Sequence, residues 1–210
     1  MDPVSASAQL QTIRTLMERV ALYRRALAPC SLLAGATGVV AASIGWGLAI
    51  SSLSAFLLLW ISTAVLTLTG SFLVIRREAV RNTEPFWTPP TRRVATAFLP
   101  PIVAAAAATA LLPGWMGPDA RWVPALLASV WMACYGLGLH AAGFFMPRGI
   151  RWLGWIFLAV SVALPSLLDR QAKSGPAGFA TANAMMGIAF GGIHLAYGLY
   201  LRLTQSPATT

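Results

Sequence analysis

The chain has 210 residues, of which 57% are hydrophobic and only 10% are charged, whereas an average soluble domain has about 25% charged residues. So few charges could not cover the surface of a soluble protein of this length, and the composition therefore predicts an integral membrane protein. The net charge of +9 would suit a nucleic-acid partner, but no basic helix interleaved with aromatic residues occurs. We therefore expect no nucleic-acid partner.

The chain begins with a polar segment, residues 1–27, that lacks the apolar core of a secretory signal. Leu10, Ile13, Met17 and Val20 recur in it at helical spacing, and polar and charged residues mostly fall on the other side. This pattern predicts an amphipathic helix at the cytoplasmic membrane interface. The alternative is a solvated leader helix.

Six apolar runs follow, each close to the about 20 residues that a helix needs to cross the hydrocarbon of a bilayer. They cover residues 28–50, 53–75, 94–113, 122–145, 151–168 and 178–201. We expect Pro100-Pro101 and Pro165 to kink or shorten the third and the fifth. The predicted fold is all-α: six transmembrane helices, arranged as three hairpins, form one domain over residues 28–204, and residues 205–210 form a disordered tail.

Arginines between the runs predict the orientation. With the N-terminus inside, twelve would lie on the cytoplasmic side: Arg14, Arg19, Arg24, Arg25, Arg76, Arg77, Arg81, Arg92, Arg93, Arg148, Arg151 and Arg202. The outer side would keep Arg121, Arg170 and Lys173. Because positive residues in short loops favour the cytoplasm, both termini are expected there.

The longest polar break between the runs, residues 76–93, is expected to be a cytoplasmic loop. Its prolines, at positions 85, 89 and 90, argue against a regular helix. We expect Phe86 and Trp87 to anchor it in the interface. The alternative is a docking surface in which Arg92 and Arg93 also contact anionic lipid headgroups. The residues singled out in this loop are Arg76, Arg77, Phe86, Trp87, Arg92 and Arg93.

The two histidines, His140 and His194, are candidate ligands. Each precedes a boundary arginine, Arg148 or Arg202, by eight residues, which puts both about 12 Å from the same membrane surface. Facing imidazoles at one depth could hold a b-type haem. The alternative is structural, because a neutral imidazole can bond to a hydroxyl or a carbonyl on another helix.

Glycines near His194 predict close helix packing. Gly187 and Gly191 have the small-residue spacing at which two membrane helices approach closely. We therefore expect this face of the last helix to contact another helix, whether or not a ligand binds nearby.

Other chemistry finds little support. No Asp, Glu or Lys lies inside the six runs, and their only Arg is Arg151, at the first position of the fifth. This composition argues against proton-coupled transport. Cys30 and Cys134 would lie at different depths, too far apart for a disulfide. No nucleophile elbow, phosphate-binding loop or zinc motif occurs, so we expect no enzyme and no metal site.

The segments EPFWTPPTRRVA, residues 84–95, and MERVALYRRA, residues 17–26, resemble a group of uncharacterised bacterial six-helix inner-membrane proteins. The resemblance implies the fold and the bacterial inner membrane, but no activity or cofactor. The leading functional hypothesis is a non-enzymatic subunit, scaffold or sensor with an arginine-rich cytoplasmic face. Its expected partners are the bilayer, anionic headgroups, and a membrane protein or a second copy. A haem-binding redox protein and a channel or carrier for a neutral solute are the alternatives.

Overall fold

The computed structural model describes residues 3–83, 85–117, 122–169 and 177–204, with the side chains of residues 3–24, 90, 168, 169 and 177 excepted. Its elements are α1 (Pro3–Gly47), α2 (Leu53–Arg81), α3 (Pro89–Met116), α4 (Val123–Ala142), α5 (Gly149–Asp169), α6 (Ala177–Met186), the π-helix η1 (Gly187–Ile193) and α7 (His194–Thr204). Six helical segments are long and apolar enough to span a membrane, and α6, η1 and α7 together make the sixth. The described residues contain no strand, so the prediction of an all-α protein with six membrane spans is confirmed.

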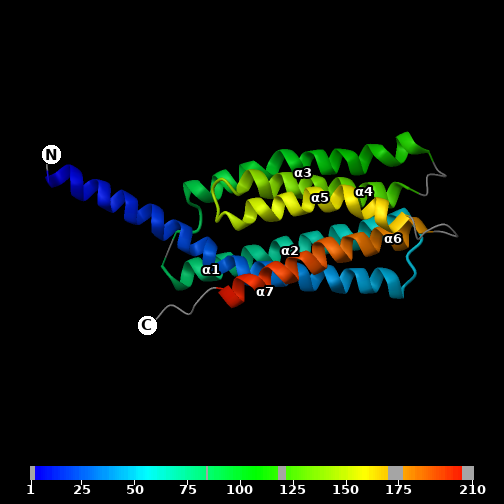
Figure 1. The fold of residues 1–210 in the computed structure, drawn as a ribbon, viewed down its shortest axis with the longest axis horizontal. Coiled ribbons are helices and arrows are strands. Elements are labelled where there is room, and N and C mark those ends of the chain that lie inside the picture. The colour runs from blue at the N-terminus through cyan, green and yellow to red at the C-terminus, as the bar shows by residue number, and fades with distance from the viewer. Residues whose placement is uncertain (1–2, 84, 118–121, 170–176, 205–210) are drawn as a thin grey trace.

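The six spans form two groups of three helices (Figure 1). In one group α4 packs between α3 and α5, and in the other α1 packs against α2, η1 and α7. The sixth span follows α5 in the chain but contacts α1 more extensively than α5, while α6 also packs on α4. The sixth span therefore packs the last helices of the chain against the first helix, α1, and through α6 it also connects the two groups.

The first helix is longer than one span. The predicted leader, residues 1–27, and the predicted first span, residues 28–50, are one continuous helix, α1, which runs through Pro29. Its first turns extend beyond the other helices at the end where both termini lie (Figure 1). We expected the leader to contact the membrane interface, and the side chains that would do so, in residues 1–24, lie outside the described ones.

The polar break between α2 and α3 is shorter than predicted. Helix α2 continues to Arg81 and α3 begins at Pro89, so only residues 82–88 form a loop. The expectation that Pro89 and Pro90 prevent a regular helix was wrong, because proline is well tolerated in the first turn, where its missing N–H has no helical partner. The Thr88 side chain caps this start by accepting a hydrogen bond from the backbone N–H of Thr91 at 3.5 Å. Arg76, Arg77, Arg92 and Arg93 therefore lie on helices.

Internal prolines do not shorten the spans. Helix α3 continues through Pro100, Pro101 and Pro113 for 28 residues, and α5 continues through Pro165 for 21 residues. Each proline removes one backbone donor. If the helix ended there, however, the neighbouring N–H and C=O groups would lose their helical partners, and hydrocarbon holds no water to bond to them. Continuing the helix is therefore the least costly arrangement for the chain.

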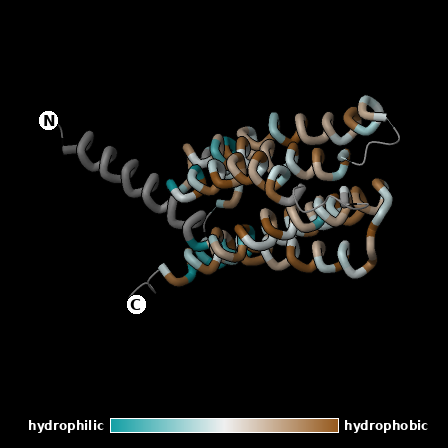
Figure 2. Tube along the Cα trace, turned by 45° about the vertical axis from the view of Figure 1, so that its right-hand side comes forward, coloured by the Kyte–Doolittle hydropathy of each residue, from teal (hydrophilic) through white to brown (hydrophobic). Residues whose placement is uncertain are grey.

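Polar residues gather at one end of the bundle, the end where the two termini lie (Figure 2). We call it the arginine-rich end, and its described arginines are Arg25, Arg76, Arg77, Arg81, Arg92, Arg93, Arg148, Arg151 and Arg202. Between this end and the opposite one, α2 and α3 expose large apolar side chains such as Leu58, Leu66 and Val103. Phe56, Met132, Phe157 and Met185 are fully buried and fill the centre. Such an outer surface is covered by the acyl chains of a bilayer.

Candidate functional site

The sixth span is the most irregular part of the structure. Its middle, Gly187–Ile193, is a π-helix, a rare form that often occurs at functional positions. Through this stretch Gly187, Gly191 and Leu195 face α1 at intervals of four residues. His194, directly after the π-helix, contacts α4 instead.

Glycines bring the π-helix close to α1. A Cβ atom added to Gly191 would lie 2.8 Å from Cγ2 of Val39, and one added to Gly187 would lie 2.6 Å from Cβ of Ala42. On the facing helix, a Cβ added to Gly38 would lie 2.8 Å from the backbone N of Gly191. Gly187 and Gly191 thus lie at a close helix contact, as their spacing predicts, and at Gly191 the two backbones meet.

His194 is buried, and both of its ring nitrogens have partners. Its Nδ1 lies 3.1 Å from the carbonyl oxygen of Phe190, and its Nε2 lies 2.9 Å from the hydroxyl oxygen of Tyr135 on α4. A carbonyl only accepts, so in the neutral ring Nδ1 carries the proton and donates to Phe190. Nε2 then accepts the hydrogen bond that the Tyr135 hydroxyl donates.

Three aromatic rings surround this imidazole. The ring centres of Phe157, Tyr135 and Phe190 lie 5.1, 5.5 and 6.1 Å from that of His194, and only 3% of its surface is exposed. These rings come from α4, α5 and η1, so the imidazole sits where the two groups of helices meet. Its hydrogen bonds and its aromatic contacts fix the position of α7 against α4.

A second buried polar pair lies at Trp60 and Asn183. The indole Nε1 of Trp60 on α2 donates to Oδ1 of Asn183 on α6 at 2.8 Å, and both residues are almost completely buried. A Cβ added to Gly45 of α1 would lie 2.6 Å from the same Oδ1, so α1 also packs closely against this amide. The pair therefore holds α2 and the sixth span together beside α1.

His140 lies in a different environment. Its ring packs edge-on against Phe144 at 5.6 Å and Trp155 at 5.2 Å between ring centres, and its Nδ1 is buried without a hydrogen-bond partner. The ring contacts of His140 and His194 share no residue.

The structure therefore does not bring the two histidines into one site. An axial haem ligand needs a free nitrogen directed at the iron, whereas both nitrogens of His194 are engaged inside the protein. These residues do not fit a bis-histidine haem.

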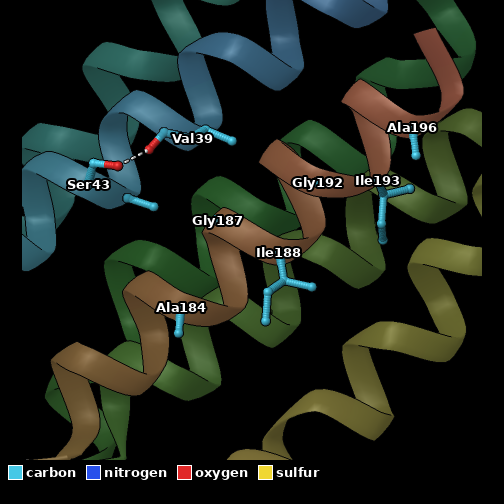
Figure 3. A pocket seen from close by; sticks show the side chains of 9 residues that line it. Val39, Ser43, Ala184, Gly187, Ile188, Gly192, Ile193 and Ala196 are labelled. Atoms are coloured by element: carbon cyan, nitrogen blue, oxygen red, sulfur yellow. Dashed lines mark hydrogen bonds between the residues drawn. The ribbon is translucent and has the colours of Figure 1, made fainter. Parts of the chain in front are cut away.

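An apolar groove lies on the outer surface of the sixth span, beside α1 (Figure 3). Its volume is about 620 Å³, and its lining residues are Val39, Ala42, Ser43, Ala184, Gly187, Ile188, Gly192, Ile193 and Ala196. Gly192 opens it, since a Cβ there would meet nothing within 4 Å. The Ser43 hydroxyl donates to the carbonyl of Val39 at 2.9 Å, so the groove offers chiefly van der Waals contacts.

The remaining candidates lie in the loop before α3. The ring of Phe86 packs edge-on against Phe72 at 5.0 Å and stacks on Trp87 at 6.3 Å between ring centres. Trp87 itself is 56% exposed, whereas Phe86 is half-buried. Phe86 thus packs the loop against α2, and Trp87 is an exposed large apolar side chain of the loop.

Sequence reasoning missed Tyr135, Trp60 and Asn183. One signal could have found the last, because Asn183 is the only side-chain amide in the six apolar runs. Such a group needs a partner inside the membrane. Tyr135 carried no comparable signal, since tyrosines also occur singly at membrane boundaries.

Comparison with protein-family models, with curated proteins and with solved structures finds no match to this chain. Six membrane spans and an apolar outer surface define the class, a polytopic α-helical membrane protein. Within it, the buried polar groups at His194 and Asn183 are bonded to other side chains or to the backbone of the bundle. These hydrogen bonds hold separate spans of the bundle together.

Proposed function

We propose that this protein is a non-enzymatic subunit, scaffold or sensor of a bacterial inner membrane, with the arginine-rich end as its contact surface. The observation that carries the proposal is the charge imbalance there. Eight of the nine described arginines are exposed and Arg151 is partly so, whereas Glu78 is the only carboxylate among the described side chains. Glu78 forms an ion pair with Arg81 at 3.7 Å, and because this pair is partly exposed it contributes little to stability. Such a surface suits an acidic region of a partner.

The buried polar groups support a structural role for the bundle. His194 and Asn183 have their hydrogen-bond partners on the backbone or on other spans, and aromatic rings pack around the imidazole. A group that takes part in chemistry needs access to a reacting molecule, whereas these two side chains are 3% and 1% exposed. We interpret them as fixing the relative positions of helices that present the arginine-rich end.

The proposal includes an orientation. Positive residues in short connections favour the cytoplasmic side, and the arginine-rich end holds nine described arginines. We therefore place this end in the cytoplasm, together with both termini. A cytoplasmic partner, a membrane-protein partner or a second copy of the chain could each reach it.

Site-specific photo-crosslinking in living cells tests the contact surface. A photoreactive phenylalanine analogue replaces Val80, which is 69% exposed on α2 at the arginine-rich end. The matched control replaces Leu48, which is 72% exposed at the opposite end. We expect adducts of discrete mass at position 80 only, and we expect Arg77→Glu to remove them.

Adducts at position 48 but not at position 80 would contradict the proposal, as would adducts that Arg77→Glu leaves unchanged. Raising the ionic strength in isolated membranes gives a second readout. Contacts between exposed charges weaken when salt shortens the screening length to about 3 Å at 1 M.

A further inference from the structure

The turn between α4 and α5, residues 143–148, carries two adjacent phenylalanines, each covered by an arginine. The guanidinium carbon of Arg151 lies 5.2 Å from the ring centre of Phe144, and that of Arg93 lies 5.8 Å from the ring centre of Phe145. Arg151 belongs to the first turn of α5 and Arg93 to the start of α3, so three segments meet here. Both phenylalanines are exposed, at 64% and 40%.

Each guanidinium lies within the distance of a cation–π contact, and this attraction to the face of the ring requires no hydrogen-bond acceptor. The N–H groups of a guanidinium form a planar fork that binds phosphate with two parallel hydrogen bonds. Among the side chains that the structure describes, no carboxylate pairs with Arg93 or Arg151. The N-termini of α3 and α5 add positive potential at the same end.

Apolar surface continues from this turn toward the membrane. The ring of His140 packs between Phe144 and Trp155, with ring centres 5.6 and 5.2 Å away. Trp155 is 55% exposed and Trp152 is 71% exposed, so the surface beside Arg151 and Phe144 is aromatic and faces outward. Exposed tryptophans at the end of a membrane span are typical of the headgroup region of a bilayer. A molecule that fits here therefore has an anionic group joined to an apolar part.

We propose that Arg93, Arg151, Phe144 and Phe145 form a binding site for the headgroup of an anionic phospholipid. The two guanidinium groups bind the phosphate through their edges, and the acyl chains extend along the surface of Trp155. The site differs from the broad attraction of arginines to anionic membranes, because each of the two cations lies over an aromatic ring of the same turn. It does not depend on the proposed protein partner.

Native mass spectrometry of the purified full chain tests the site. The protein is incubated with phosphatidylglycerol in detergent micelles and is then released from the micelles inside the spectrometer. Phosphatidylcholine serves as the neutral reference. A hydrogen bond between a guanidinium and a phosphate contributes about 1.5 kcal/mol, which corresponds to about tenfold in affinity. We expect Arg151→Gln and Arg93→Gln each to lower the relative affinity for phosphatidylglycerol by about that factor.

Matched controls separate this site from unspecific charge. Arg77→Gln and Arg202→Gln remove the same charge at the same end of the bundle, but neither arginine lies over Phe144 or Phe145. Because salt screens exposed charges that form no direct contact with the lipid, we expect these variants to change the affinity by less than about twofold. Phe144→Leu keeps the charge of Arg151 but removes the ring beneath it, and we expect it to weaken binding as well. The proposal is overturned if the control arginines matter as much as Arg93 and Arg151, or if Phe144→Leu has no effect. Displacement of the lipid by millimolar inorganic phosphate would also overturn it, by showing a site for the free anion.

Discussion

The hydroxyl of Tyr135 on α4 lies 2.9 Å from Nε2 of His194 on α7, and this hydrogen bond joins the two groups of helices. The residues are 59 positions apart in the chain and belong to spans that do not follow one another. The π-helix ends at Ile193, directly before the imidazole. The sixth span thus makes two contacts within four residues, Gly191 with α1 and His194 with α4.

Removal of this hydroxyl is expected to destabilise the bundle. Tyr135→Phe keeps the ring but leaves Nε2 of the buried His194 without a partner, which should cost about 0.5–2 kcal/mol of the free energy of unfolding. Thermal unfolding of the detergent-solubilised protein measures the effect. Tyr200→Phe is the matched control, because Tyr200 is 59% exposed and should be neutral to the same change. Equal melting curves for the two variants would contradict the role of the Tyr135 hydrogen bond.

The histidine geometry also leads to an expectation about haem. Purified protein mixed with haemin should show no Soret and α bands of a bis-histidine centre, because both nitrogens of His194 are engaged and His140 lies among other rings. Absorption spectra before and after reduction measure this directly. A sharp reduced α band that disappears in His194→Ala and in His140→Ala would contradict the expectation.

Gly45 should tolerate no larger side chain. A Cβ there would lie 2.6 Å from Oδ1 of Asn183, and the amide cannot move without losing its bond to Trp60. Gly45→Ala should therefore lower the free energy of unfolding by about 1–3 kcal/mol. Gly47→Ala provides the matched control two residues away on α1, since a Cβ there would meet nothing within 4 Å. If Gly45→Ala unfolds at the same temperature as Gly47→Ala, then the amide has room to move.

Two adjacent glycines of the π-helix should respond in opposite ways. A Cβ on Gly191 would lie 2.8 Å from Val39, so Gly191→Ala should separate η1 from α1 and cost about 1–3 kcal/mol. Gly192 faces the open groove, so Gly192→Ala should leave stability unchanged or raise it by up to about 1 kcal/mol, through the lower entropy of the unfolded chain. Denaturant or thermal unfolding of both variants measures the difference. Equal losses at both positions would mean that the π-helix itself requires glycine.

The spans were predictable from the sequence because length and apolarity decide whether a segment crosses a bilayer. The spacing of Gly187 and Gly191 similarly indicated a close helix contact, since small residues drive packing where lipid gives no hydrophobic force. The start of α3 at Pro89 was also accessible in principle, because proline at the first helical position is favourable. These features depend on a few neighbouring residues.

The contacts between distant spans were not predictable in the same way. Trp60 and Asn183 are 123 positions apart, and nothing in the runs around them distinguishes the face that meets a helix from the face that meets lipid. In a soluble helix, polar residues mark the outer face, whereas here both faces are apolar. The π-helix was missed for a related reason, because its glycines indicate close packing equally well in a regular helix. The partner of His194 was missed for the first reason, because Tyr135 lies 59 positions away in another apolar run.

The orientation predicted from the arginines can be tested with single cysteines in a variant that lacks Cys30 and Cys134. Asn82→Cys lies at the end of α2 in the arginine-rich end, and Ser51→Cys lies between α1 and α2 at the opposite end. A membrane-impermeant maleimide should label Ser51→Cys in intact cells and should label Asn82→Cys only after permeabilisation. The reason is energetic, because the membrane potential and anionic lipids both favour arginines on the cytoplasmic side. The reverse pattern would place nine described arginines outside the cell, and the arginine-rich end could then meet no cytoplasmic partner.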